Sequence, residues 1–130
     1  MNSLALFSSA RQNWKTPKAV FEDLDQEFCF DCDPCPPDPD PEFDGLICDW
    51  GRCNFVNPPY SQIKLWLEKA IKEYEKGKWV VLLLPSRTGT DWFHECVLPH
   101  ANETRFIRGR LRFDDCKENA PFDSMIVVYR

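Results

Sequence analysis

Apolar residues recur with helical spacing over residues 61–76, and this is the clearest amphipathic pattern in the chain. The intervals between them follow the i, i+3, i+4, i+7, i+8, i+11 series of a single buried stripe. On the solvent side, Glu68 and Lys72 stand four residues apart and favour a helix through an ion pair. Gly77 is placed to end the helix. The pattern predicts a helix whose apolar stripe consists of Ile63, Trp66, Leu67, Ala70, Ile71 and Tyr74.

Continuous apolar runs predict the strands. The run at residues 79–84, Trp-Val-Val-Leu-Leu-Leu, is typical of a strand covered on both faces of a sheet. Two more helices are expected. One begins with Thr16 as its N-cap and Pro17 as its first residue, and a short one covers residues 91–97 behind Thr90. The remaining strands are predicted at residues 28–32, 54–56, 103–107, 110–113 and 124–129.

Helices that alternate with buried strands indicate an α/β fold, with a sheet between two layers of helices. Residues 14–130 are expected to form a single domain, and the polar residues 1–13 a flexible leader. In such sheets, ligands bind at the carboxyl ends of the strands. Two unusual segments follow predicted strands directly. One is the loop at residues 33–45, whose five prolines exclude a helix or a central strand, and the other is the turn Asn57-Pro58-Pro59-Tyr60.

Composition narrows the classes of protein. The chain has 130 residues and a net charge of -5, which argues against a protein that coats nucleic acid through bulk positive charge. A local basic patch remains compatible with that charge. We find no membrane span or secretion signal, so we expect a cytoplasmic protein with no membrane partner. The 7 cysteines are then expected to be reduced thiols.

The turn Asn57-Pro58-Pro59-Tyr60, called the 57–60 turn below, suits one kind of chemistry. The prolines restrict the backbone, so the Asn57 amide oxygen and the Pro58 carbonyl can be held as two fixed acceptors. Tyr60 adds a flat face beside them. A heteroaromatic amine is a poor nucleophile because its lone pair is delocalised into the ring. Two acceptors on its N–H groups, with the ring stacked, would prepare it for methyl transfer by geometry and electrostatics.

At this point the sequence resembles a known family, the phage-type DNA N6-adenine methyltransferases. The resemblance runs from Trp14 to the end of the chain and consists of many motifs in the same order. They are Thr16-Pro17, Phe30-Asp31-Cys32-Asp33, Asp44-Gly45-Leu46, Asp49-Trp50, the 57–60 turn, Leu82-Leu83-Leu84-Pro85 with Arg87, Trp92-Phe93-His94, Arg108-Gly109-Arg110-Leu111-Arg112-Phe113 and Ala120-Pro121-Phe122-Asp123-Ser124.

The resemblance implies a fold and a cofactor. The fold is a compact, truncated version of the Rossmann-like methyltransferase fold, and the methyl donor is S-adenosylmethionine. By the same resemblance, the 57–60 turn is expected to bind the target amine. The residues expected to bind the cofactor are Thr16 and Pro17, Asp33 with Asp31 as the near alternative, and Asp49 and Trp50 at the cofactor's adenine.

The chain departs from the family pattern after its first predicted strand. No glycine-rich loop stands there, and Pro34-Cys35-Pro36-Pro37 takes its place. The stretch from residue 33 to residue 49 is too short for the usual helix and second strand. The acidic residue for the cofactor ribose therefore has no clear counterpart, although Glu42 or Asp44 could take that role.

Two further groups of residues have more than one interpretation. Along the strand-like segment at residues 108–112, every second residue is an arginine (Arg108, Arg110 and Arg112), so the three side chains would point to the same face. They could contact phosphates together or form a solvated face. Arg87 lies near the expected site. Cys29, Cys32 and Cys35 have metal-ligand spacing. We expect no metal, because strand alternation would direct Cys29 and Cys32 to opposite faces. His94 is interpreted as a packing or capping residue.

The leading hypothesis is methylation of adenine N6 in double-stranded DNA, with the target base flipped out of the helix. Recognition of a DNA sequence would then come from loops, from residues 108–112 or from the partner in a homodimer. One alternative keeps the turn but acts on RNA or on a glutamine amide in a protein. Another is a degenerate module that binds nucleic acid without catalysis.

Overall fold

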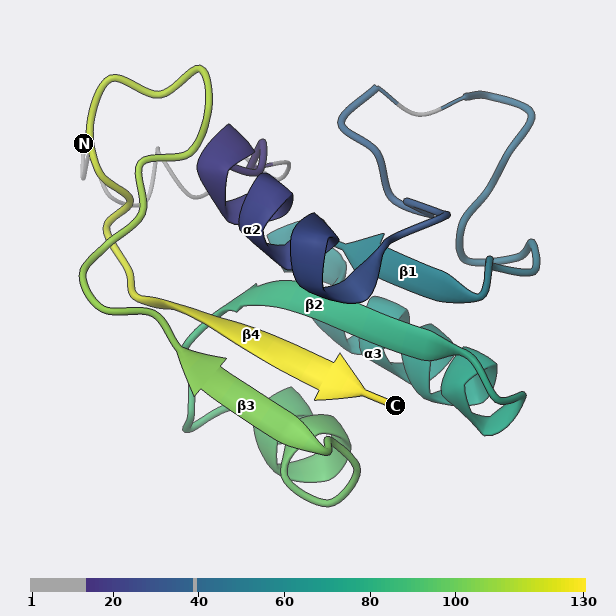
Figure 1. The fold of residues 1–130 in the computed structure, drawn as a ribbon. Helices are drawn as coiled ribbons and strands as arrows, with labels where there is room; N and C mark the ends of the chain where they lie inside the picture. Colours follow the sequence, from purple (N-terminus) through teal and green to yellow (C-terminus); the bar gives the residue numbers. More distant parts are fainter. Residues whose placement is uncertain (1–13, 39) are drawn as a thin grey trace.

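The structure is a computed structural model, and it describes residues 14–38 and 40–130. The predicted leader, residues 1–13, lies outside the described residues. Figure 1 shows the chain as a sheet with helices packed on both of its faces. The elements are α2 (Lys18–Phe28), β1 (Cys53–Val56), η1 (Tyr60–Gln62), α3 (Ile63–Glu75), β2 (Trp79–Pro85), η2 (Phe93–Val97), β3 (Glu103–Phe106) and β4 (Ser124–Tyr129).

The sheet has four strands in the order β1-β2-β4-β3. Strand β1 pairs parallel with β2, whereas β4 is antiparallel to both β2 and β3. Strands β1, β2 and β3 therefore end at one edge of the sheet, where β4 begins. Cys32 forms a parallel bridge with Asn54 of β1, so the chain after Cys32 also leaves at this edge. We call it the carboxyl edge. The prediction of a mixed α/β fold is confirmed.

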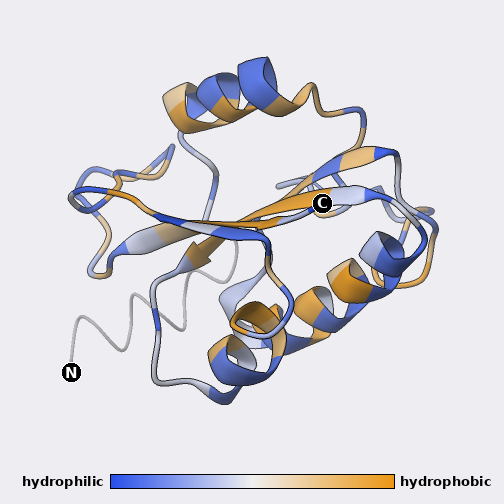
Figure 2. Cartoon of the chain, turned by 60° about the horizontal axis from the view of Figure 1, so that its bottom comes forward, coloured by the Kyte–Doolittle hydropathy of each residue, from blue (hydrophilic) through white to orange (hydrophobic). Residues whose placement is uncertain are grey.

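Side chains alternate between the two faces of the central strand and meet a different helix on each face. Figure 2 shows the apolar sides of the helices turned toward the sheet. On one face, Leu24 and Phe28 of α2 pack with Val81 and Leu83 of β2. On the other face, the packed residues of α3 and β2 are Trp66, Leu67, Ala70, Val80, Leu82 and Leu84. This double burial explains the unbroken apolar run that the sequence shows at residues 79–84.

The predicted strand at residues 28–32 is wrong. Helix α2 continues through Phe28, whose side chain is buried in the core. Cys29 then ends the helix in a left-handed conformation with φ 56°, and its N–H donates to the Asp25 carbonyl at 2.8 Å. Before the prolines begin, this segment forms a single β-bridge with β1, at Cys32, and the Asp31 N–H donates to the Cys53 carbonyl at 3.0 Å. The apolar run was the end of a helical stripe rather than a strand.

The predicted strand at residues 110–113 is also wrong. Gly109 takes φ +75° and turns the chain, and the following residues fold back within the loop between β3 and β4. The Ala120 N–H donates to the Leu111 carbonyl at 2.7 Å, which closes that loop on itself. Phe113 is buried against the Trp14 ring, with ring centroids 5.3 Å apart. Burial in a loop thus produced the apolar pattern of a short strand.

Helix boundaries differ from the predictions in detail. Pro17, not Thr16, is the N-cap residue of α2, and no side chain caps this helix. A single turn of 3-10 helix, η1, precedes α3, which ends at Glu75. Gly77 follows with φ +94°, as expected of a residue that ends a helix. Before η2, the Thr90 hydroxyl accepts a hydrogen bond from the Phe93 N–H at 3.3 Å, as expected of a capping residue, although the N-cap position of η2 is Trp92.

A buried charge joins the segment before β1 to helix α3. Glu73 is fully buried, and its Oε1 accepts hydrogen bonds from the Trp50 N–H at 2.6 Å and from Lys78 Nζ at 3.2 Å. Its Oε2 pairs with Lys76 Nζ at 2.8 Å. Burial by itself raises the pKa of a carboxyl group, but these donors outweigh it and lower the Glu73 pKa to about 2. The charge therefore holds Asp49 and Trp50 in place.

None of the helices within residues 14–38 and 40–130 has both the length and the apolar content needed to cross a bilayer.

Candidate functional site

Four segments that are distant in sequence leave the sheet at the carboxyl edge. The proline-rich loop follows Cys32, and the 57–60 turn follows β1. Ser86 and Arg87 follow β2, and the loop of residues 107–123 connects β3 to β4. The Asp114 N–H donates to the Lys15 carbonyl at 3.0 Å, which joins this last loop to the segment before α2. The predicted site segments therefore share one edge of the sheet.

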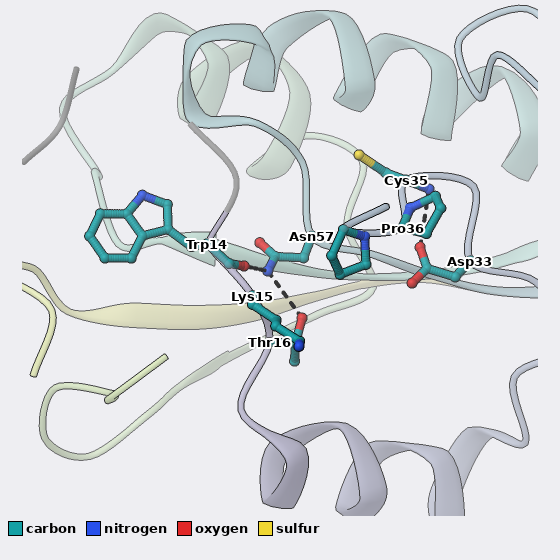
Figure 3. A pocket seen from close by; sticks show the side chains of 8 residues that line it. Trp14, Lys15, Thr16, Asp33, Cys35, Pro36 and Asn57 are labelled. Carbon is teal, nitrogen blue, oxygen red and sulfur yellow. Dashed lines mark hydrogen bonds between the residues drawn. The ribbon is translucent and has the colours of Figure 1, made fainter. Parts of the chain in front are cut away.

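The Asn57 side chain is held from one side only. Its Nδ2 donates to the Trp14 carbonyl and, at 3.0 Å, to the Thr16 hydroxyl (Figure 3). Its Oδ1 is buried and has no hydrogen-bond partner among the described residues. A buried acceptor without a partner costs about 1–3 kcal/mol. The amide is therefore fixed with its carbonyl oxygen available to a ligand.

Tyr60 lies among aromatic rings next to this amide. Its ring is 6.1 Å from the Trp14 ring at an interplanar angle of 26°, and 5.4 Å from the Phe122 ring. The hydroxyl is buried without a partner in the described part of the chain. Burial raises the pKa of Tyr60 above its ordinary value, although the nearby Arg87 guanidinium opposes this. The side chain is thus a neutral platform at neutral pH.

Two serines at the carboxyl edge also have hydroxyl groups without a hydrogen-bond partner among the described residues. Ser86 follows the last residue of β2, and Ser124 is the first residue of β4, paired with Pro85 in the sheet. Both hydroxyl oxygens are buried and lack a partner within the described ranges. Buried polar side chains in proteins usually have partners. Their accumulation at the carboxyl edge, together with Asn57 and Tyr60, indicates a place where a ligand supplies the missing partners.

A first cavity lies between the start of the described chain and the proline-rich loop, and it encloses about 290 Å³ of space free of protein atoms, part of which is open to solvent. Asn57, Thr16 and Lys15 line one side, and Asp33 lies opposite (Figure 3). Asp33 Oδ1 accepts the Cys35 N–H at 3.0 Å. Solvent still reaches the Asp33 side chain, but protein atoms crowd its carboxyl group, and this desolvation raises the pKa to about 6. The cavity that Asn57 lines thus also carries a carboxylate at neutral pH.

A second cavity of about 720 Å³ adjoins the first, because Cys35 and Pro36 line both. Its other walls include Asp44, Pro59 and Trp66. Burial raises the pKa of the Cys35 thiol to about 12, with a smaller contribution from Asp33. Cys35 is therefore a neutral wall residue and not a nucleophile.

Three other predicted cofactor residues, Asp31, Asp49 and Trp50, lie outside both cavities. The Asp31 carboxylate accepts the N–H groups of Cys53 at 3.1 Å and Arg52 at 3.2 Å, and these hydrogen bonds lower its pKa. Asp49 is exposed and pairs with Lys76 at 2.9 Å. Trp50 is buried, and its Nε1 donates to the Gly45 carbonyl at 2.6 Å. In this structure all three side chains hold the segment before β1.

Of the remaining two predicted cofactor residues, Thr16 lines the first cavity through the group that fixes Asn57. Pro17 adjoins it at the start of α2, where its carbonyl accepts the Phe21 N–H at 3.1 Å.

The four predicted DNA-binding arginines are exposed in loops at the carboxyl edge. Arg110 lies 3.8 Å from the Asp123 carboxylate, a weak surface ion pair. Arg87, Arg108 and Arg112 form no ion pair with any other described residue. Since residues 110–113 are not a strand, the argument from strand parity does not hold. The charges nevertheless gather on the loops that surround the 57–60 turn.

Sequence reasoning missed three residues of this site. Trp14 was named only as the residue where the family resemblance begins, but its carbonyl holds the Asn57 amide and its ring packs on Tyr60. Ser86 carried no signal beyond its position at a strand end, and Ser124 was quoted only as the last residue of a family motif, without a role. Within the described chain, no group of three histidine, cysteine or acidic side chains could hold a metal ion. His94 hydrogen-bonds to the Thr88 carbonyl at 2.8 Å and braces the loop after β2.

Comparison with known proteins identifies the family. A family model described as "DNA N-6-adenine-methyltransferase (Dam)" matches residues 5–128. A DNA N-6-adenine-methyltransferase of Haemophilus phage HP1 is 36% identical over 101 residues, which cover 68% of this chain and 58% of the relative. One of Escherichia phage T1 is 31% identical over 103 residues, which cover 67% of this chain and 41% of the relative.

The chain thus spans about half the length of the curated relatives it matches. No solved structure matches it. The family model covers nearly all of the chain, including the 57–60 turn and each segment of the carboxyl edge. The chain therefore belongs to the DNA N-6-adenine-methyltransferase (Dam) family.

Proposed function

We propose that this protein transfers a methyl group from S-adenosylmethionine to the N6 amino group of adenine in DNA. One observation carries the proposal: Asn57 Oδ1 is a buried acceptor without a partner, on an amide that is fixed beside the Tyr60 ring. The names of the phage relatives support the same reaction. They also support a phage-encoded protein that acts in the cytoplasm of a bacterial host.

The orientation of the Asn57 amide follows from its partners. The Trp14 carbonyl accepts only, so the side-chain atom that faces it must be the NH₂ group. Asn57 Oδ1 can then accept one N–H of the target amine, and the Pro58 carbonyl the other. Both bonds draw electron density toward the nitrogen and favour a tetrahedral arrangement. The Tyr60 ring, which burial keeps neutral, holds the base by stacking.

The residues of the first cavity fit one end of the methyl donor. S-adenosylmethionine, when bound, supplies an electrophilic methyl group on a sulfonium centre. Its amino-acid end carries an ammonium group, and the Asp33 carboxylate has no cationic partner within the described residues. Asp33 would hold the ammonium group, and Thr16 lines the opposite side of the cavity. This arrangement does not require a glycine-rich loop.

DNA would bind across the carboxyl edge. Arg87, Arg108, Arg110 and Arg112 can contact phosphates there, although the whole chain has a net charge of -5. The target adenine must leave the duplex to reach Asn57. Recognition of a DNA sequence would come from these loops or from a homodimer. Sedimentation analysis of the chain with and without duplex DNA tests the homodimer.

We further infer that the fold is a compact, truncated version of the three-layer Rossmann-like methyltransferase fold. Helices on both faces of the sheet support this assignment, as does a candidate ligand site at the carboxyl edge. The sheet is short on the side of β1, where the bridge at Cys32 takes the place of a full strand. A crystal structure with bound S-adenosylhomocysteine would test the assignment.

A competition assay separates the proposal from its alternatives. Labelled S-adenosylmethionine would be offered with equal amounts of duplex DNA, single-stranded RNA and a glutamine peptide. We expect label in the DNA alone. Label chiefly in RNA or peptide would change the proposed substrate but leave the proposed active site unchanged. Binding of DNA without transfer to any substrate would instead favour a non-catalytic module, for which the fixed Asn57 amide has no use.

A further inference from the structure

The second cavity has walls of mixed polarity. Pro34, Pro59 and Phe43 are among its apolar residues, and Asp44 adds one carboxylate. The Asp44 Oδ1 atom accepts the Leu46 N–H at 2.9 Å, so Oδ2 remains for a ligand. Apolar rings beside a few polar groups suit a planar heterocycle attached to a sugar.

The 57–60 turn contributes to both cavities. Asn57 lines the first and Pro59 lines the second, and the two cavities share Cys35 and Pro36. An elongated ligand that fills both must therefore pass the turn at its middle. In S-adenosylmethionine, the reactive methyl group stands at the middle, between the amino-acid and nucleoside ends. The small first cavity carries the Asp33 carboxylate, which suits the ammonium group, and this leaves the larger second cavity, with Asp44, for the nucleoside.

Trp66 lines the second cavity and carries an unsatisfied donor. It belongs to α3, its side chain is 6% exposed, and its Nε1 has no partner among the described residues. The ring is held by stacking on Trp50 at 6.2 Å and 26°. A Cβ on Gly45 would lie 2.7 Å from Trp66 Cη2 and 2.0 Å from the Pro34 carbonyl oxygen. Gly45 thus lets the loop lie directly against the indole.

We propose that the second cavity binds the nucleoside end of the methyl donor, and that the Trp66 indole N–H donates a hydrogen bond to a ring nitrogen of its adenine. The inference rests on the proposed function and deepens it. Asp44 then faces the ribose hydroxyls. This differs from the family-based expectation that Asp49 and Trp50 contact the adenine, because both N–H groups of Trp50 are already bonded within the protein.

Calorimetry on the full chain tests the assignment with two probes. S-adenosylhomocysteine contains both ends of the ligand, whereas 5′-methylthioadenosine lacks the amino-acid end. Trp66→Phe removes the N–H and keeps a stacked ring, and we expect it to weaken both probes about tenfold, the typical effect of a lost buried hydrogen bond. Asp33→Asn should weaken S-adenosylhomocysteine alone. Trp79→Phe, at the opposite edge of the sheet, is the matched control and should change neither.

Each outcome decides the inference. Unchanged binding of 5′-methylthioadenosine to Trp66→Phe would overturn it while leaving the proposed reaction intact. Equal weakening of both probes by Asp33→Asn would overturn the assignment of the two ends. If S-adenosylhomocysteine does not bind the wild-type chain, the proposed cofactor fails as well. Should Trp66→Phe not fold, as judged by circular dichroism, Asp44→Asn decides: a severalfold loss of 5′-methylthioadenosine binding supports the inference, and no loss contradicts it.

Discussion

Replacing Glu73 with glutamine removes one buried negative charge and keeps the shape of the side chain. The charge has a large effect because Trp50, Lys76 and Lys78 all donate to it. Its pKa falls from 4.5 to about 2, and at about 1.4 kcal/mol for each pH unit this gives a stabilisation of about 3 kcal/mol at neutral pH. We expect Glu73→Gln to lower the free energy of unfolding by about that amount.

The pH dependence of the free energy of unfolding provides a second test of the role of Glu73. Because the pKa of Glu73 is lower in the folded state, its contribution is complete above pH 4.5 and is lost as the pH falls toward 2. Urea unfolding followed by circular dichroism at pH 7 and pH 3 measures it. Glu75→Gln, an exposed neighbour on the same helix, is the control and should change stability by less than about 0.5 kcal/mol. The reasoning is refuted if Glu73→Gln unfolds like the wild type at pH 7, or if its deficit is equally large at pH 3.

Three further predictions concern the site. Asn57→Ala should reduce methyl transfer by about a hundredfold or more, through loss of a fixed acceptor, while S-adenosylhomocysteine binding measured by calorimetry stays near wild type; retained transfer would remove Asn57 from the mechanism. The pKa of Asp33 is raised to about 6, so the affinity for S-adenosylhomocysteine should fall as the pH drops through 6, because protonation removes the charge that holds the ammonium group. Asp33→Asn should abolish this pH dependence. An unchanged pH profile in the variant would argue against the role. Arg108→Ala and Arg112→Ala should each weaken DNA binding in a filter assay and lower the salt slope by about one, without changing cofactor affinity, and an unaltered slope would assign both residues to a solvated face.

Much of the fold could be predicted from local patterns. The helix at Ile63–Glu75 and the strand at Trp79–Pro85 follow directly from apolar periodicity, because each buries a regular face. The patterns failed where burial came from irregular structure. Phe28 belongs to a helix that covers the sheet, and Phe113 is buried in a loop against Trp14. An apolar residue in the sequence predicts burial, but it does not predict the backbone conformation of the buried segment.

The candidate site divides in the same way. The 57–60 turn could be found because its prolines make the sequence distinctive and because it follows a strand. The role of the Trp14 carbonyl could not be predicted, because Trp14 and Asn57 are 43 residues apart in the sequence. In the sequence, Asp33 was the first candidate for the cofactor carboxylate and Asp31 the near alternative. The structure separates them: backbone N–H groups occupy Asp31, whereas Asp33 lines the first cavity.

Methyl transfer to DNA is the most direct test of the account. The wild-type chain and Asn57→Ala would be incubated with radiolabelled S-adenosylmethionine and unmethylated duplex DNA, and the DNA digested to nucleosides. We expect the wild type to produce labelled N6-methyl-2′-deoxyadenosine and the variant to produce none, although both bind S-adenosylhomocysteine. Label in another nucleoside, or unlabelled DNA from a wild-type chain that binds S-adenosylhomocysteine, would contradict the assignment of this site to adenine N6.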